Sequence, residues 1–320
     1  MNEISENRYT SEDLKTMQSW SLERKIQTTQ TRIMEWYIRN GGKVYVSFSG
    51  GKDSTVLLDL ARRIYPDIQA VYCDTGLEYP EIKQYVRSKE NVTILRPEMN
   101  FRKVIETYGY PLGSKHISKI IESYRDGKEW SFKYIEPTNP EYKNHSSFSL
   151  SDKWFDFAEN SDIKVSDKCC RIMKKTPLHK FQLETKKYPI IATMAEEGIQ
   201  RRKSWLKNGC NSFDSKEPKS QPMSFWTEQD VLRYLKEFNI PYASVYGDIV
   251  QDKNGKYATT GCKRTGCVFC GFGAHLEKEP NRFQMLKQTH PKLWDYCMKD
   301  WEKGGLGMKD VLEYINVKTE

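Results

Sequence analysis

One hexapeptide, Ser49-Gly50-Gly51-Lys52-Asp53-Ser54, constrains the fold of this chain more than any other feature of the sequence. An apolar run at 44–48 precedes it, and apolar residues at helical spacing follow it over 56–64. A strand, a glycine-rich turn and a helix in that order form the phosphate-binding corner of many α/β proteins. The hexapeptide therefore predicts an anion site at the start of a helix.

Each residue type in this loop suits a phosphate ligand. Two glycines let the backbone approach an anion, and the free amides and dipole of the helix start attract negative charge. Lys52 can neutralise phosphate oxygens, the Ser49 and Ser54 hydroxyls can donate to them, and Asp53 suits the orientation of the loop or of Mg²⁺. The spacing differs from that of a Walker A loop. The alternative is a glycine turn with solvated polar residues.

Strands and helices alternate along the first 110 residues. We expect strands at 44–48, 68–73, 92–95 and 189–193, and helices at 22–38, 81–89, 171–186 and 227–238. This order predicts an α/β fold with a parallel, Rossmann-like sheet. We divide the chain into an N-terminal arm and helix (1–42), a nucleotide-binding α/β domain (43–250) with an insertion or lid at 110–166, and a C-terminal cysteine-rich, helical portion (251–320).

Composition narrows the class of protein. The 320 residues are 38% hydrophobic and 29% charged, which excludes a disordered chain, and no apolar run is long enough to span a membrane. The polar, acidic start does not resemble a secretory leader, so we expect a cytoplasmic protein. The net charge is +8, and 12 Lys and Arg against 5 Asp and Glu give residues 171–220 a net of +7. That stretch suits a nucleic acid or a phosphorylated nucleotide.

Five of the eight cysteines form two groups. Cys169 and Cys170 are adjacent, and Cys267 and Cys270 form a CxxC pair with Cys262 five residues before it. Such grouping in a reducing compartment predicts metal binding rather than disulfides. The four paired thiols can hold a [4Fe–4S] cluster or zinc, and adjacent ligands are uncommon for zinc. Cys262 is either a further ligand or a free thiol that handles sulfur.

The motifs resemble those of a known family. The loop is similar to the PP-loop of the ATP pyrophosphatase, or adenine nucleotide alpha hydrolase, superfamily, and three more motifs resemble its phosphoadenosine phosphosulfate (PAPS) reductase-like branch. These are Asp74-Thr75-Gly76; Glu196 followed by Arg201-Arg202; and Phe225-Trp226-Thr227-Glu228, with Phe225 where Asp is usual. The cysteine pattern resembles that of adenosine phosphosulfate (APS) reductases and of the sulfur-inserting subunit of DNA phosphorothioation systems.

The loop chemistry and the resemblance together suggest roles for these residues. Lys52 and Asp53 would be catalytic, Glu196, Arg201 and Arg202 would bind substrate or anion, and Cys169, Cys170, Cys267 and Cys270 would hold the cluster. We add Cys262 as a catalytic candidate, because it is a possible free thiol that handles sulfur. The nucleotide, ATP with Mg²⁺, would contact residues at the ends of two strands. These are Ser47, Ser49, Gly50, Gly51, Lys52, Asp53, Ser54, Asp74, Thr75 and Gly76. The alternatives without a functional role are a turn cap for Asp74 and a solvated helix face for the two arginines.

Three functions remain open. The first is an enzyme that cleaves ATP to AMP and pyrophosphate and passes sulfur, from a donor protein, to an acceptor such as nucleic acid. The second is an APS or PAPS reductase that releases sulfite, but those enzymes carry their attacking cysteine in a Glu-Cys-Gly tail, and residues 304–320 contain no cysteine. The third is a non-catalytic nucleotide- and cluster-binding subunit. We favour the first.

Overall fold

The computed structural model describes residues 7–135 and 149–320, which form two compact units. Unit 1 contains the described residues up to Asp74, Glu78–Arg96 and Pro177–Thr265. Unit 2 contains Thr75–Leu77, Pro97–Thr176 and Gly266–Glu320. Both units are therefore built from separate stretches of chain, whereas the three-part division made from the sequence follows the chain and stays a prediction.

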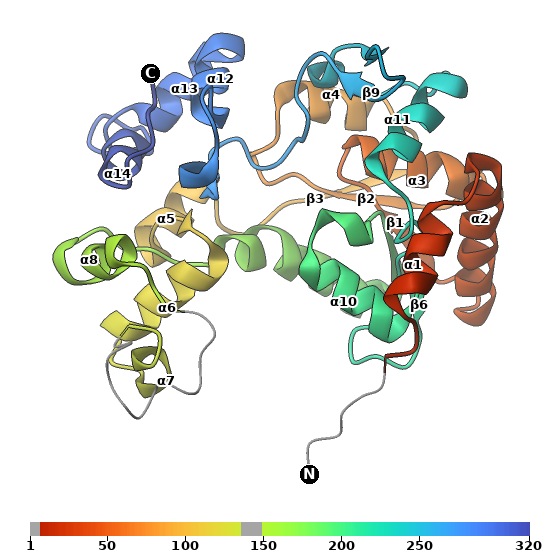
Figure 1. Cartoon of the computed structure of the whole chain (residues 1–320), viewed down its shortest axis with the longest axis horizontal. Coiled ribbons are helices and arrows are strands. Elements are labelled where there is room, and N and C mark those ends of the chain that lie inside the picture. The colour runs from red at the N-terminus through yellow and green to blue at the C-terminus, as the bar shows by residue number, and fades with distance from the viewer. Residues whose placement is uncertain (1–6, 136–148) are drawn as a thin grey trace. The chain divides into compact units, whose positions relative to one another are not determined.

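Unit 1 is organised around a six-stranded sheet with the strand order β3-β2-β1-β5-β7-β6 (Figure 1). Its strands are β1 (Val44–Ser47), β2 (Ala70–Cys73), β3 (Val92–Leu95), β5 (Tyr188–Ile191), β6 (Asn211–Ser212) and β7 (Lys219–Ser220). All pairs are parallel except β6 with β7. The prediction of an α/β fold with a mostly parallel sheet is confirmed.

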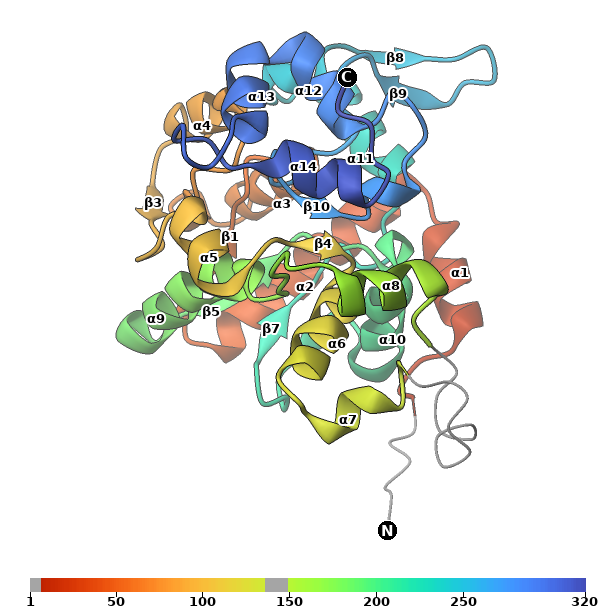
Figure 2. The same cartoon turned by 90° about the vertical axis from the view of Figure 1, so that its left-hand side faces the viewer.

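Helices and a hairpin complete unit 1. The α-helices are α1 (Ser11–Gln18), α2 (Leu22–Arg39), α3 (Lys52–Arg62), α4 (Pro80–Arg87), α9 (Thr176–Thr185, whose first residue belongs to unit 2), α10 (Ile199–Asn208) and α11 (Glu228–Glu237). The short 3-10 helices are η2 (Ala195–Glu197) and η3 (Ser244–Tyr246). The strands β8 (Ile249–Gln251) and β9 (Tyr257–Thr259) form the hairpin at the upper right of Figure 2.

Burial explains why these segments adopt these elements. Residues of β1 and β2 are mostly buried, as in a parallel sheet covered on both faces. Eight of the eleven residues of α3 are buried, which fixes this helix firmly behind the loop that precedes it. The core includes Val46, Leu57, Ile190 and Trp226, each with no measurable exposure. The loop at 49–54 is thus carried by the best-packed strand and helix of the unit.

Two segments differ from expectation. The N-terminal arm contains a helix, α1, because Thr10 and Asp13 form a capping box at its start. The helix expected at 171–186 begins as a π-helix, η1 (Arg171–Lys175), before it continues as α9. Helical periodicity in the sequence does not distinguish a π turn from an α turn.

Unit 2 is mainly helical. Its helices are α5 (Phe101–Tyr108), α6 (Lys115–Arg125), α7 (Glu129–Phe132), α8 (Asp152–Asn160), η1, η4 (Ala274–Leu276), α12 (Arg282–Thr289), α13 (Pro291–Met298) and α14 (Met308–Tyr314). Two short strands, β4 (Leu112–Gly113) and β10 (Gly271–Phe272), pair in parallel. The expected insertion at 110–166 supplies β4, α6, α7 and α8, and its residues 136–148 lie outside the described residues.

Within the described residues, the helices are too short or too polar to cross a lipid bilayer.

Candidate nucleotide and cluster sites

The loop lies at the carboxyl end of β1, where the direction of the sheet order changes. β2 pairs with one side of β1 and β5 with the other. In open α/β sheets ligands bind at such a switch point, beside the carboxyl ends of the strands. The segments that follow β1, β2 and β5 carry the predicted loop, Asp74, and the Glu196–Arg202 region, respectively. The sheet therefore brings three separate predicted motifs to one edge.

Gly50 is required by both its backbone and its neighbours. Its φ is +73°, a left-handed conformation that favours glycine. A Cβ atom placed there would lie 2.7 Å from Val86 Cγ2 and 2.9 Å from Ile82 Cγ2. Gly51 then forms the N-cap of α3 and supplies no side chain to cap it. The start of α3 therefore has no side-chain cap, and the anion site expected there stays a prediction.

The loop serines hold the turn itself. The Ser49 and Ser54 hydroxyls lie 3.0 Å apart, and the Ser49 amide donates to Ser54 Oγ at 3.2 Å. The Gly51 amide also donates to Ser49 Oγ, at 3.3 Å. Ser47, the last residue of β1, is half-buried below the loop. Both loop hydroxyls thus have structural partners in addition to any ligand that they contact.

Lys52 is buried at the first position of α3, with its side chain 5% exposed. Its Nζ lies 3.1 Å from Glu228 Oε1 and donates to the Lys263 carbonyl at 3.2 Å. Its backbone amide donates to the Tyr246 hydroxyl at 3.2 Å. A buried ammonium needs such partners, because desolvation of an unpaired charge is costly. Lys52 is therefore a fixed positive charge beside the open end of α3.

Asp53 follows Lys52 in the same helical turn. Its Oδ1 atom is buried without a hydrogen-bond partner and lies 3.9 Å from Lys52 Nζ. Burial raises the pKa of Asp53, the neighbouring Lys52 opposes that rise, and Glu228 adds to it. A buried carboxylate oxygen without a donor suits a cation, and Mg²⁺ in nucleotide sites commonly uses one or two carboxylates plus phosphates.

The segment after β5 contributes charges of both signs. Glu196 Oε1 accepts the backbone amide of Glu228 at 2.5 Å, so this carboxylate fixes the start of α11. Burial raises the pKa of Glu196, and Glu228 adds to the rise. Arg201 forms an ion pair with Glu197, and Arg202 is exposed on α10. Arg201 acts electrostatically on Asp53, whereas Glu196 has a structural role that the sequence did not predict.

The Asp74-Thr75-Gly76 motif is divided between the two units. Asp74 belongs to unit 1, where its Oδ1 lies 3.2 Å from Lys83 Nζ. Thr75 and Gly76 belong to unit 2, and Thr75 Oγ1 accepts the amide of Leu77 at 3.2 Å. Gly76 has a φ of +79° and open space where a Cβ would lie.

Sequence reasoning missed several residues of the loop site. The Tyr246 and Thr265 hydroxyls are hydrogen-bonded at 2.6 Å, and the Tyr246 hydroxyl also accepts the Lys52 amide. Glu228 belongs to a motif that was noticed, but no site role was assigned to it. Arg264 acts electrostatically on both Asp53 and Glu196. Its local sequence, three residues before Cys267, gave no indication of this role.

The four cysteines predicted as ligands line one small cavity in unit 2. Its walls also include apolar residues and one lysine; the lining is Leu77, Phe101, Pro111, Cys169, Cys170, Met173, Lys174, Cys267 and Cys270. η1 carries the first pair at its N-terminal end, and the turn before β10 carries the second. Two thiol pairs about a hundred residues apart in sequence are therefore neighbours in the fold.

The pKa values of these thiols are shifted in opposite directions. A hydrogen bond from Cys169 lowers the pKa of Cys170 to about 5, and Lys115 and Lys174 reinforce the effect. The pKa of Cys169 is raised, by the same hydrogen bond and by burial. Burial also raises the pKa of Cys270. Lysines beside the pair offset the negative charge that bound thiolates bring.

Four cysteine thiols line this cavity, which is the number of protein ligands that a [4Fe–4S] cluster takes. Zinc is also held by up to four thiolates, about 2.3 Å from the metal. Across residues 7–135 and 149–320, no three His, Cys, Asp or Glu side chains are arranged to hold one metal ion. The cluster stays a prediction.

Cys262 belongs to unit 1, whereas the four predicted ligand cysteines belong to unit 2. Its side chain is half-buried, burial raises its pKa, and a hydrogen bond with Tyr79 opposes that rise. Its backbone amide donates to the Val245 carbonyl at 2.9 Å, on the segment that also carries Tyr246. This placement agrees with a thiol of the loop site more than with a fifth cluster ligand.

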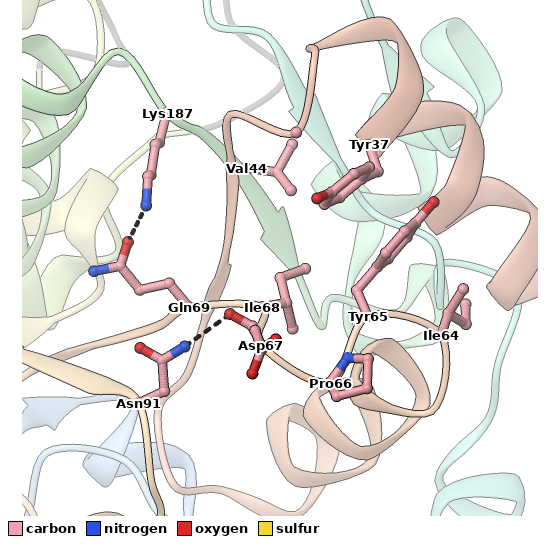
Figure 3. A pocket seen from close by; sticks show the side chains of 11 residues that line it. Tyr37, Val44, Ile64, Tyr65, Pro66, Asp67, Ile68, Gln69, Asn91 and Lys187 are labelled. Atoms are coloured by element: carbon pink, nitrogen blue, oxygen red, sulfur yellow. Dashed lines mark hydrogen bonds between the residues drawn. The ribbon is translucent and has the colours of Figure 1, made fainter.

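The opposite edge of the sheet holds a cavity of about 480 Å³ (Figure 3). Tyr37 and Tyr65 stack face to face there, with ring centroids 3.8 Å apart. Lys187 Nζ donates to Gln69 Oε1 at 2.6 Å. These residues precede the strands, so the cavity lies at the amino ends of β1, β2 and β5. None of the residues predicted for the site lines it.

The fold is α/β, and unit 2 contains a cysteine-lined cavity. Comparison with known proteins gives the family. The phosphoadenosine phosphosulfate reductase domain matches residues 43–119 and 128–271. The chain belongs to this family. The likeness to the DNA phosphorothioation subunit stays a prediction.

Individual relatives are distant. An adenosine 5'-phosphosulfate reductase from Staphylococcus haemolyticus is 27% identical over 67% of this chain and 70% of its own length. A protein from Methanocaldococcus jannaschii, described as uncharacterized, is 28% identical over 91% of this chain but only 55% of its own length. A solved PAPS reductase from Candida auris is 14% identical, with a TM-score of 0.39 over 78% of this chain and 99% of its own.

Proposed function

We propose that this protein binds an adenine nucleotide with its phosphates at the 49–54 loop and acts on the sulfur group of a sulfonucleotide, APS or PAPS. The named relatives support this substrate class, because they include APS reductases from several bacteria and a PAPS reductase from Gloeobacter violaceus. The observation that carries the proposal is the buried Lys52 at the uncapped start of α3. A helix start with a fixed positive charge is suited to phosphate.

The residues of unit 1 provide the binding chemistry. Lys52, Arg201 and Arg264 offset the charge of the phosphosulfate, and the open amides at the start of α3 orient it. Asp53 presents its unpartnered oxygen to Mg²⁺ or to a donor of the ligand. Fixed charges that stabilise the departing α-phosphate lower the barrier to breaking the S–O bond that joins it to the sulfonate.

Cys262 is our candidate nucleophile. Its thiolate would attack the sulfonate sulfur, and the S–O bond to the α-phosphate of the nucleotide would break. The enzyme would then carry an S-sulfonated cysteine. A dithiol reductant would then release sulfite and become a disulfide. The thiolate is the nucleophile, so the Cys262 thiol must lose its proton before it attacks. Burial raises the pKa of Cys262 and so disfavours that loss. The Tyr79 hydroxyl is the group that contacts this thiol.

Cys169, Cys170, Cys267 and Cys270 would hold a [4Fe–4S] cluster in unit 2, and Lys115 and Lys174 would offset its charge. When bound, the cluster supplies a redox-active and electrostatically polarising centre. Free thiol ligands of this kind require a reducing compartment, so we place the protein in the cytoplasm.

A second candidate is ATP-dependent sulfur transfer. The intact Ser-Gly-Gly-Lys-Asp-Ser loop favours it, because Lys52 and Asp53 together suit the pyrophosphate and Mg²⁺ of ATP. In that reaction an acceptor oxygen attacks the α-phosphorus, pyrophosphate leaves, and sulfur from a donor protein then displaces AMP. Exposed Arg202, Lys203 and Lys207 on α10 suit a nucleic-acid acceptor.

One anaerobic experiment separates these functions. The iron-assayed protein is incubated with APS, PAPS or Mg-ATP, and sulfite, AMP and pyrophosphate are measured. With a dithiol, sulfite and AMP from APS, or sulfite and adenosine 3',5'-bisphosphate from PAPS, support the proposal. AMP and pyrophosphate from ATP, with no product from APS or PAPS, replace it with the second candidate. Tight binding of all three without turnover indicates a non-catalytic subunit.

Lys52→Ala is the matched variant for that experiment. Loss of one fixed charge at the reacting phosphate is expected to reduce kcat/KM by about 10²- to 10³-fold. The cluster absorbance is expected to stay unchanged, because Lys52 and the ligand cysteines belong to different units. Lys103→Ala, at an exposed ion pair of unit 2, is the control. Full turnover by the Lys52 variant would contradict the assignment of the loop.

A further inference from the structure

The ammonium group of Lys52 has few donors to spare. It can donate three hydrogen bonds. Glu228 Oε1 at 3.1 Å and the Lys263 carbonyl at 3.2 Å take two of them, and Asp53 Oδ1 lies farther away, at 3.9 Å. A phosphate oxygen that binds Lys52 closely must therefore take the last donor or replace one of these acceptors.

Glu228 is the acceptor that can leave. The Lys263 carbonyl belongs to the backbone, and Asp53 Oδ1 is buried in the first turn of α3. The Glu228 side chain is 44% exposed, whereas that of Lys52 is 5% exposed. Rotation of one side chain into solvent is thus enough to free the ammonium.

The backbone of Glu228 is held in place while its side chain stays free to rotate. Its amide donates to Glu196 Oε1 at 2.5 Å. Thr227 and Asp230 form a capping box at the start of α11. Asp230 also pairs with the buried Lys25 at 2.6 Å. Glu228 therefore returns to the same place whenever Lys52 is released.

The charges around the loop nearly balance. Asp53, Glu196 and Glu228 provide negative charge, and Lys52, Arg201 and Arg264 provide positive charge; these groups act on one another electrostatically. Glu228 adds to the raised pKa values of both Asp53 and Glu196, and its carboxylate lies 3.1 Å from Lys52 Nζ. Loss of the Glu228 charge would leave the site with one more positive charge.

We propose that Glu228 is the anion that Lys52 binds in the nucleotide-free protein, and that a phosphate of the nucleotide displaces it. The inference rests on the proposed function, because it requires phosphates at the 49–54 loop. Glu228 stabilises the buried ammonium without nucleotide and opposes every anion that enters. Its charge disfavours highly charged ligands most, so it selects APS over ATP.

The test is the binding of inorganic pyrophosphate, APS and ATP to the intact protein and to Glu228→Gln, by anaerobic calorimetry. Gln keeps the size of the side chain and removes its charge. We expect about tenfold tighter pyrophosphate binding, equal to 1.4 kcal/mol, and a larger gain for ATP than for APS. The free variant is expected to melt at a lower temperature, because Lys52 loses its counter-charge. Glu237→Gln, at the other end of α11, is the control and should bind as the wild type does.

The outcomes are separable. Tighter pyrophosphate binding with a lower melting temperature supports the exchange. Unchanged or weaker binding by Glu228→Gln overturns it and makes Glu228 a group that orients Lys52 for the ligand. If neither protein binds pyrophosphate, the exchange is also overturned. Turnover of APS by the wild type is measured separately, so the proposed function can stand when the inference fails. Pyrophosphate exchange without APS turnover would instead contradict the proposed reaction and leave the phosphate site in place.

Discussion

At the scale of single residues, the loop combines a well-packed backbone with an unfavourable charge. A side chain at Gly50 would lie too close to Val86 and Ile82, so only glycine fits this turn. Asp53 lies next to this turn with a buried oxygen that no donor satisfies. Groups of this kind persist where function requires them, at a cost in stability.

The first prediction concerns the stability cost of Asp53. Burial raises the pKa of Asp53 above its usual value near 3.8, so the folded protein prefers the neutral carboxyl. The stability that this preference provides is present below pH 3.8 and is lost as the pH rises through the folded pKa. Asp53→Asn is therefore expected to raise the melting temperature at pH 7 by about 2 °C and to lose turnover.

The check is a series of melting curves from pH 3.5 to pH 8. The difference between the Asn variant and the wild type should shrink toward zero at the acidic end, where both side chains are neutral. Asp67→Asn, an exposed carboxyl before β2, is the control. A variant that melts below the wild type at pH 7 would show that the Asp53 charge stabilises the fold.

The residues of the site that could be predicted from the sequence are those that are adjacent in the chain. The loop from Ser49 to Ser54 was predicted because its residues are adjacent and lie between a strand and a helix. Tyr246 lies 194 residues from Lys52 in the chain, and nothing in its local sequence indicates that contact. Arg264 carries no such local signal either, although it acts electrostatically on Asp53.

At the scale of elements, the start of α11 depends on a buried ion pair with α2. Lys25 is 1% exposed, and its Nζ contacts Asp230 Oδ2 at 2.6 Å and the Gln18 carbonyl at 2.7 Å. Lys25→Ala leaves the carboxylate of Asp230 without its partner, and the expected loss is about 3 kcal/mol of unfolding free energy. Urea unfolding, read by tryptophan fluorescence, measures this loss.

The neighbouring surface pair provides the comparison. Arg233 and Glu237 pair at 2.6 Å on the exposed face of α11. Arg233→Ala is expected to cost less than about 1 kcal/mol, because exposed pairs are weak. Equal losses in the two variants would mean that the Lys25–Asp230 pair does not position α11.

A second prediction at this scale concerns the cysteine ligands. Cys267→Ser is expected to lose most of its iron and acid-labile sulfide, since four thiolates are needed to hold the cluster. Cys262→Ser is the control, because that residue belongs to unit 1, and it should keep both. Metal analysis and the visible absorbance measure the effect. Full iron in the Cys267 variant would refute the ligand set, and loss of iron from the Cys262 variant would add a ligand.

Elements were predictable where local signals were strong. β3 was expected at 92–95 and occurs there, and α11 begins at the Thr227 cap that the sequence indicated. The π turn of η1 was not predictable, because apolar spacing gives no information on which carbonyl an amide chooses. The pairing of β5 with β1 also lay beyond sequence reasoning, since 140 residues separate them.

At the scale of the whole molecule, the chain is divided so that each unit contains one candidate site. The chain passes between the units five times, once within α9 and once between Thr265 and Gly266. The residues of the loop site end at Thr265, and the second ligand pair begins at Cys267. The loop at 49–54 thus belongs to unit 1 and the four predicted ligand cysteines to unit 2, while Thr75 and Gly76 of the predicted nucleotide motif also belong to unit 2.

This division predicts separate responses to the two ligands in hydrogen exchange. Pyrophosphate should slow amide exchange in unit 1, at residues 49–55 and 244–247, because it orders the start of α3 and the Tyr246 contact. Anaerobic removal of iron should speed exchange in unit 2, at residues 169–175 and 267–272, which lose the bonds that hold the thiols together. Mass spectrometry of peptides from the intact chain measures both. If iron removal accelerates exchange at 49–55 as strongly as at 267–272, the two sites form one cooperative unit, and the independence expected for the Lys52 and Cys267 variants is lost.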